Sequence, residues 1–200
     1  MYTNISKNFY LKRPMNKFLP LSLSLIATSF FSGVANANFV EVSYEDWTLT
    51  NLSLSGPRVV GSIEVTDSYS LEVSTTAVDT TVSLGTAGIK YDGIGVGYTT
   101  ELTDNIGLKV IVEHLKSNFW SETSTTSSEK VSGMNYEVSF TMGITDDVDG
   151  IVGISESNVA GATTNKIFGI SVGVTENMDL TFSTSNSQVK IQSLGLRYNF

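Results

Sequence analysis

The sequence predicts an all-β protein, a closed antiparallel up-and-down barrel of ten strands, on three observations. The first is a repeated turn: four times, a β-patterned run stops at a Thr, an acid and a small polar residue, and a second run begins. The four copies are Thr66–Ser68, Thr103–Asn105, Thr145–Asp147 and Thr175–Asn177. The second is the alternation of apolar and polar residues on both sides of each turn. The third is an export signal at the N-terminus, which sends the sheet out of the cytoplasm.

Each polar trio predicts a tight hairpin turn, because Asp and Asn tolerate left-handed backbone and bond to nearby backbone groups. Four trios give four hairpins. One further run near Phe39–Glu45 precedes the first hairpin, and another near Gln188–Phe200 follows the last. The count is therefore ten strands, with eight as the alternative if Phe39–Glu45 or the weakly patterned first hairpin does not join the sheet.

The alternation divides each hairpin between two environments, since successive side chains of a strand point to opposite faces. In the second hairpin one face is almost wholly apolar. Its predicted pairs are Leu102 with Ile106, Thr100 with Leu108, Tyr98 with Val110, Val96 with Val112 and Ile94 with His114. The opposite face is small, polar or charged, and the other three hairpins follow the same phase.

Residues 1–37 have the features of a cleavable secretory signal peptide. They contain four basic residues and no acid, then an apolar, hydroxyl-rich run from Phe18 to Phe31. They end in an A-x-A site formed by Ala35 and Ala37, with cleavage expected after Ala37. Met15–Ala37 is by itself a complete signal, so residues 1–14 are alternatively an extension before the true start. An uncleaved anchor is a further alternative, and residues 38–200 form the predicted barrel domain.

Composition excludes several classes of function. Removing residues 1–37 leaves eight basic residues against twenty acids, so the net charge falls from −8 to about −12. Such a chain is not expected to bind nucleic acid, whose phosphates need Lys and Arg partners. The absence of cysteine excludes disulfides and thiolate chemistry. We expect no cofactor.

A soluble β-sandwich also alternates, so length and the polar face must decide between a packed core and a lipid-facing surface. Ile94–Leu102 is nine residues long, which matches the roughly 9–11 residues that a tilted strand needs to cross hydrocarbon. Aromatic residues are expected at the rims of the apolar face, and Tyr91, Tyr136, Phe168 and Tyr198 are assigned there. These features favour a transmembrane barrel, whose closure also removes free sheet edges.

The signal peptide, the four turns, the strand at Ile94–Tyr98 and the ending Leu194–Phe200 together resemble the small outer-membrane β-barrel proteins of Gram-negative bacteria, the porin-family or barrel-domain proteins. The resemblance implies a location in the Gram-negative outer membrane. It also implies that the barrel assembly machinery reads the last strand through Leu194, Leu196, Tyr198 and Phe200. Periplasmic chaperones during biogenesis, outer-membrane lipid and lipopolysaccharide are the implied partners of a monomer. The family is defined by architecture, so it implies no single activity.

Loop lengths predict the orientation, because such barrels have short periplasmic turns and longer extracellular loops. The four trios are then periplasmic. The long loops are expected near Asp46–Pro57, Thr76–Thr86, Ser117–Lys130 and Ser157–Asn165. Residues Ser117–Lys130 are the clearest of these, with Ser or Thr at 8 of 14 positions.

The polar phase of the strands predicts which charges face the lumen. They are Glu41, Glu45, Glu64, Glu72, Glu101, Lys109, Glu113, Glu137, Asp149, Asp179 and Arg197. Four of the acids lie two residues from a turn and are expected to ring the periplasmic mouth: Glu64, Glu101, Asp149 and Asp179. The lumen is either a narrow cation-preferring passage or an interior filled by ion pairs around Lys109 and Arg197. The small size of a ten-strand barrel favours a plugged or water-threaded interior.

Catalysis has little support in the sequence. His114 is the only histidine, its phase points it outward, and no G-x-S-x-G or H-E-x-x-H motif occurs. The acids of Asp146–Asp149 lack the spacing of a calcium loop, so we assign them to the turn and expect no metal site. We expect a structural or surface-interaction protein without catalysis, with a small, weakly cation-selective channel as the first alternative and a lipid-acting enzyme as the second.

Overall fold

The computed structural model describes residues 37–49, 52–82, 85–122, 126–159 and 163–200. The predicted signal peptide lies outside these residues except for Ala37, which begins the first strand. In the described part of the chain, no helix combines the length and apolar character needed to cross a membrane.

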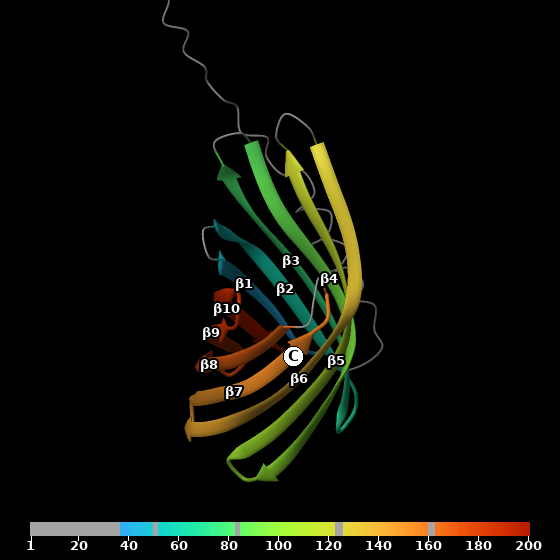
Figure 1. Ribbon diagram of the computed structural model, residues 1–200. Helices are drawn as coiled ribbons and strands as arrows, with labels where there is room; N and C mark the ends of the chain where they lie inside the picture. The colour runs from blue at the N-terminus through green and yellow to red at the C-terminus, as the bar shows by residue number, and fades with distance from the viewer. Residues whose placement is uncertain (1–36, 50–51, 83–84, 123–125, 160–162) are drawn as a thin grey trace, which may run out of the picture. The chain divides into compact units, whose positions relative to one another are not determined.

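Ten antiparallel strands form a closed barrel, so the ten-strand prediction is confirmed over the eight-strand alternative. The strands are β1 (Ala37–Leu49), β2 (Leu52–Thr66), β3 (Tyr69–Val82), β4 (Gly85–Thr103), β5 (Ile106–Glu122), β6 (Thr126–Thr145), β7 (Val148–Ser157), β8 (Thr163–Thr175), β9 (Met178–Asn186) and β10 (Lys190–Asn199). Each strand pairs with its neighbours in the chain, and β10 pairs with β1 to close the sheet (Figure 1). Closure gives every strand a partner on both sides, although β6 extends beyond its ladder with β7 at Thr126–Met134.

The four polar trios form the hairpin turns at one end of the barrel, which we call the turn end. In each turn the residue before the Thr is skipped in the pairing, which makes a β-bulge; these residues are Val65, Leu102, Ile144 and Val174. In three turns the Thr hydroxyl accepts a hydrogen bond from the backbone N–H of the last trio residue, as Thr103 Oγ1 does from Asn105 at 3.4 Å. The Thr is therefore a turn-forming residue as much as the acid that follows it.

Each turn is also bonded to the next hairpin. The carbonyl of the last trio residue accepts a backbone N–H from the strand beyond, at 2.8–2.9 Å in all four cases. The pairs are Thr99 N–H to Ser68, Gly143 N–H to Asn105, Gly173 N–H to Asp147 and Asn199 N–H to Asn177. This repeated bond fixes the register between hairpins, which the turn alone cannot do.

The predicted strand register is confirmed away from the turns. In the second hairpin Thr100 pairs with Leu108, Tyr98 with Val110, Val96 with Val112 and Ile94 with His114. The closing pair differs, because Thr103 rather than Leu102 lies opposite Ile106. The bulge at Leu102 accounts for the difference, since one extra residue on that strand shifts only the last pair.

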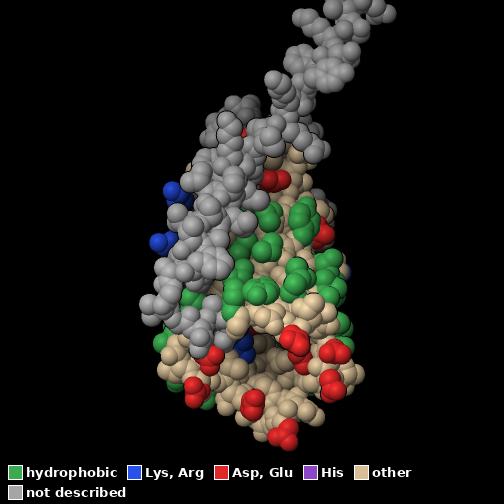
Figure 2. All heavy atoms as spheres, turned by 180° about the vertical axis from the view of Figure 1, so that it is seen from behind, with side chains coloured by type: hydrophobic (Ala, Val, Ile, Leu, Met, Phe, Trp, Pro, Cys, Tyr) green, Lys and Arg blue, Asp and Glu red, His purple; other side chains and the backbone are tan. Residues whose placement is uncertain are grey.

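The outer face carries a continuous belt of large exposed hydrophobic side chains, which we call the apolar band. On β6 it runs from Tyr136 to Ile144, and on β10 from Leu194 to Tyr198. On the face seen in Figure 2, hydrophobic side chains gather across the middle of the barrel and acids gather toward the turn end. A water-soluble sheet would bury such a face, so the band is a surface suited to lipid.

Three of the four predicted long loops are wrong, because most of Asp46–Pro57, Thr76–Thr86 and Ser117–Lys130 belongs to strands. In the fourth, Ser157–Asn165, four of the nine residues belong to strands. These segments lie beyond the apolar band, where water contacts both faces, so the hydropathy alternation that marked the other strands is lost there. Pairing with the neighbouring strand still holds the backbone. As a result the pairs β3–β4 and β5–β6 project past the other strands at the end opposite the turns, which we call the connection end (Figure 1).

Candidate functional site

The lumen is the candidate site, because buried polar side chains gather there. Short hydroxyl side chains cover much of the inner face. The buried ones include Ser43, Ser62, Ser70, Thr76, Ser117, Ser139, Ser155, Ser171, Thr181 and Ser193. Glu41, Glu45 and Glu72 are equally buried. Carboxylates at such depth need cations or hydrogen-bond donors, and the structure supplies both.

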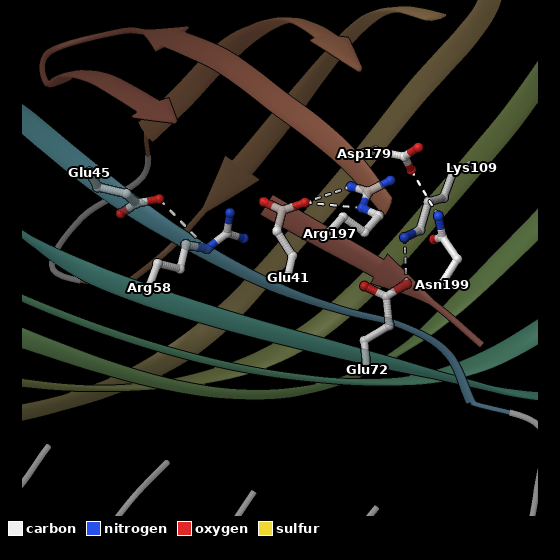
Figure 3. A network of polar contacts seen from close by, with 8 residues as sticks. All are labelled: Glu41, Glu45, Arg58, Glu72, Lys109, Asp179, Arg197 and Asn199. Carbon is white, nitrogen blue, oxygen red and sulfur yellow. Dashed lines mark hydrogen bonds and ion pairs between the residues drawn. The ribbon is translucent and has the colours of Figure 1, made fainter. Parts of the chain in front are cut away.

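Glu41 and Arg197 face each other on the paired strands β1 and β10. Arg197 donates to Glu41 Oε2 from Nη2 at 2.8 Å and from Nε at 3.1 Å (Figure 3). The guanidinium also lies over the ring of Phe39, with Cζ 4.4 Å from the ring centroid. Two predicted lumen charges therefore form one cross-strand ion pair that rests on an aromatic ring.

Glu72 on β3 reaches Lys109 on β5, with Oε1 2.7 Å from Nζ (Figure 3). The strand between them, β4, has Gly97 at this level, and a Cβ atom there would lie only 2.7 Å from Glu72 Oε1. The missing side chain lets the carboxylate cross β4. Lys109 Nζ also lies 5.4 Å from the Phe39 ring centroid. Because β1 and β5 are not neighbouring strands, this contact spans the lumen.

Glu113 of β5 also reaches β3 across β4, at Gly93, two inner-face positions along the strand from Gly97. Its carboxylate accepts a hydrogen bond from Ser74 of β3, and a Cβ atom at Gly93 would overlap both groups. Glu137 lies on the inner face of β6 opposite Ile111 of β5, within range of the charges of Lys109 and Arg58. The sequence predicted both acids as lumenal, but not their partners.

Arg58 is a lumenal cation that the sequence analysis missed. Its Nε lies 3.6 Å from Glu45 Oε1 (Figure 3). Glu45 Oε2 also accepts a hydrogen bond from Trp47 Nε1 at 2.8 Å. The strand phase that assigned Glu64 to the lumen also assigns Arg58 there. The signal was overlooked because the expected loop ended at Pro57, beside it.

An apolar cluster lies on the inner face of the barrel toward the connection end. Trp47 of β1, Leu54 of β2 and Val78 of β3 are its buried members. Tyr91 of β4 packs against Trp47 with ring centroids 5.4 Å apart. The prediction that Tyr91 lies on the lipid-facing rim is therefore wrong. It is an odd number of residues from Ile94, which places it on the opposite face of β4.

A hollow of about 260 Å³ opens between two turns at the turn end, and Figure 2 shows acids around this rim. Its lining includes Asp146, Asp147, Asp149, Glu176 and Asp179. Asp179 accepts a hydrogen bond from Asn199 at 2.9 Å. The predicted acidic ring is thus brought together in part: Asp149 and Asp179 share this hollow, whereas Glu64 and Glu101 lie on other hairpins and do not line it.

The remaining candidates lie on the outer face. His114 is opposite Ile94 and Met134 on the neighbouring strands, so neither of the residues paired with it is a carboxylate. Across the described residues, no group of three or more His, Cys, Asp and Glu side chains is placed to hold a metal ion. Leu194, Leu196, Tyr198 and Phe200 are all exposed, and the rings of Tyr198 and Phe200 meet edge-on at 4.9 Å.

No model of a protein family matches the sequence, and no curated protein is similar to it. Solved outer-membrane barrels do match the structure. The β domain of the Bordetella autotransporter BrkA shares 11% identity over 84% of this chain and 100% of its own, with a TM-score of 0.53. An outer membrane channel from Pseudomonas putida F1 shares 9% identity over 84% of this chain and 97% of its own, with a TM-score of 0.50. Ail, the attachment invasion locus protein of Yersinia pestis, shares 12% identity over 84% and 100%, with a TM-score of 0.45. The chain therefore has the fold of the Gram-negative outer-membrane β-barrel proteins.

Proposed function

We propose that this protein is an integral protein of the Gram-negative outer membrane with a structural or surface-interaction role and a closed interior. One observation carries the proposal: side chains from strands that are not neighbours touch across the lumen at two levels. Phe39 of β1 meets Lys109 of β5, and Trp47 of β1 meets Tyr91 of β4. An open pore needs a continuous water-filled path, and side chains that meet across the lumen narrow that path.

In this proposal the turn end is periplasmic and the connection end is outside the cell. Outer-membrane lipid and lipopolysaccharide surround the monomer. The assembly machinery reads the outward residues from Leu194 to Phe200 during biogenesis, with chaperones holding the unfolded chain. Catalysis is not part of the proposal, because the only histidine, His114, lies on the outer face between apolar neighbours.

The closed interior is tested by single-channel recording of the refolded protein in planar bilayers. Heat-modifiable migration on gels first shows that the barrel has folded. The wild type is expected to give no conductance steps or only small ones. The double variant Trp47→Ala/Tyr91→Ala removes the aromatic bridge and should raise the conductance.

The matched control is Tyr136→Ala/Phe168→Ala, which removes two aromatic side chains of the outer face and should leave the conductance unchanged. Large steps in the folded wild type would refute the closed interior. Recovery of the wild type as a soluble species that folds without detergent or lipid would refute the membrane location itself.

A narrow cation-preferring passage is the second candidate, favoured by the acid-lined hollow at the turn end. If small steps occur, the reversal potential in a KCl gradient should show preference for K⁺, and acid should block the current by protonating the carboxylates. Asp149→Asn/Asp179→Asn should weaken the preference. Anion preference in the wild type would exclude this candidate.

A further inference from the structure

The basic side chains of the described residues divide sharply between the two faces of the barrel. Arg58, Lys109 and Arg197 face the lumen, where each is paired with a glutamate. The five other lysines share the phase of the apolar band and lie beyond it toward the connection end: Lys90, Lys116, Lys130, Lys166 and Lys190. Five acids share this outward phase at the same end, namely Asp46, Asp79, Asp92, Glu122 and Glu156. The lysines are therefore distinguished by how they are arranged in rows, and not by an excess of positive charge.

Four of these lysines form two copies of one arrangement. On β4, β5 and β6, Lys90 lies opposite Asn118, which lies opposite Lys130. On β8, β9 and β10, Lys166 lies opposite Asn186, which lies opposite Lys190. We call each Lys–Asn–Lys row a triplet. Neighbouring strands are about 4.8 Å apart, so the two lysine Cα atoms of a triplet are about 10 Å apart with an amide between them.

Both triplets lie close to the edge of the apolar band. Lys166 is two residues beyond Phe168, and Lys90 is four residues beyond Ile94. Trp120 lies one outward row beyond Asn118, and its ring covers Gly88. Tryptophan at a strand position just outside an apolar band is typical of the lipid head-group level. The triplets therefore lie at the depth where lipid phosphates are found.

We propose that the two Lys–Asn–Lys triplets are binding sites for phosphate groups of the surrounding lipid, a proposal that rests on the proposed membrane location. Two ammonium groups on flexible stems can converge on one phosphate while the amide N–H groups between them donate to its oxygens.

The two triplets differ in how much of their charge is already neutralised. Lys90 Nζ lies 2.9 Å from Asp92. Neither Lys166 nor Lys190 forms an ion pair with another described residue, although Glu156 on β7 and Asp46 on β1 lie one row away. The triplet of Lys166, Asn186 and Lys190 should thus be the stronger of the two sites.

Native mass spectrometry of the refolded protein in a neutral detergent tests the proposal. The probes are lipid A with two phosphates, lipid A with one phosphate, and phosphatidylcholine as the zwitterionic reference. The wild type should prefer the bisphosphorylated lipid. Since each lysine near a charged lipid surface contributes severalfold to binding, Lys166→Gln/Lys190→Gln should weaken it by at least about tenfold. Lys90→Gln/Lys130→Gln should weaken it less.

The matched control is Lys116→Gln, which removes an outward lysine of the same level that is not in a triplet. It lies opposite Asp92 and Ser132, so its row offers no second lysine and already holds a carboxylate. It should therefore change the affinity by less than about twofold. Heat-modifiable migration checks every variant. If a double variant fails to fold, Lys166→Gln and Lys190→Gln are measured singly, with about fivefold loss expected for each.

Three results would overturn the inference: equal losses in Lys116→Gln and the triplet variants, no loss in either triplet variant, or displacement of the lipid by millimolar inorganic phosphate. The last result would assign the sites to free phosphate instead of a lipid head group. Failure of the wild type to fold in detergent or lipid would instead refute the proposed function, which the gel assay detects separately.

Discussion

Each lumenal cation is held by one nearly buried carboxylate, and the consequences of breaking these pairs are unequal for the two partners. Glu41, Glu45 and Glu72 keep at most 10% of their side-chain surface exposed, whereas Arg58, Lys109 and Arg197 keep 26–35%. The cations can therefore recover hydration from lumenal water more easily than the glutamates can. Removing a cation should cost more than removing its carboxylate.

The pair of Glu41 and Arg197 provides the test. Arg197→Met leaves a buried carboxylate without its two donors and should lower the free energy of unfolding by about 1.5–3 kcal/mol. Glu41→Gln keeps the shape and should cost less. Urea unfolding in lipid vesicles measures both, and the double variant completes a mutant cycle. Equal costs for the two single variants would show that the lumen is dry around both groups.

Strand phase alone predicted the lumenal position of these charges, because a side chain's face depends only on counting residues from a turn. It could not predict which charges would meet. Glu72 contacts Lys109 across an intervening strand, and that contact depends on the size of the side chain at Gly97. Arg58 was not predicted as a lumenal cation, because the loop expected near Asp46–Pro57 ended next to it and its place on a strand was not recognised.

At the scale of one element, β4 is the strand across which side chains of β3 and β5 contact each other. Its inner face has glycine at 93, 95 and 97, and polar contacts from β3 to β5 cross it at Gly93 and Gly97. The glycines serve here to leave space above the backbone, which is a reason for glycine within a strand that propensity would not predict.

Gly97→Ala should therefore destabilise the barrel. The added Cβ displaces Glu72 from Lys109, at a cost of about 1–2 kcal/mol that outweighs the smaller entropic gain of replacing glycine. Gly107→Ala on β5 is the control, because its Cβ would have no neighbour closer than 3.9 Å. It should be neutral or raise stability by about 0.4–1 kcal/mol. Chemical unfolding of both variants in the same vesicles measures the two changes in unfolding free energy. Equal changes would refute the role assigned to β4.

The ends of the elements were harder to predict than their middles. Within the apolar band, alternation fixed both phase and register, and the four turns were located correctly. Beyond the band Ser117–Lys130 has no alternation to read, yet it forms the ends of β5 and β6 on either side of residues 123–125. Hydropathy reports the solvent on each face of a strand, whereas backbone pairing sets its length.

For the whole molecule, the exposed apolar band is the feature that separates a membrane barrel from a soluble one. In water an exposed Phe replaced by Lys costs little. At the middle of a bilayer the same change costs about 2–4 kcal/mol. The band can therefore be tested by a substitution whose effect depends on the solvent rather than on packing.

Phe140→Lys places a charge at the centre of the band on β6 and should lower the unfolding free energy in lipid vesicles by about 2–4 kcal/mol. Ser132→Lys lies on the outward phase of the same strand beyond the band and should have almost no effect. Denaturant titration of both variants provides the measurement. A cost below about 1 kcal/mol for Phe140→Lys would place that face in water.

The pairs β3–β4 and β5–β6 continue as paired backbone past the ends of the other strands at the connection end (Figure 1). A phage tail, antibody or host receptor that approaches this end would meet a stiff, hydroxyl-rich wall instead of a pliable loop. Because the backbone at this end is already ordered by strand pairing, binding of such a partner would cost little conformational entropy. Recognition would then depend on shape complementarity.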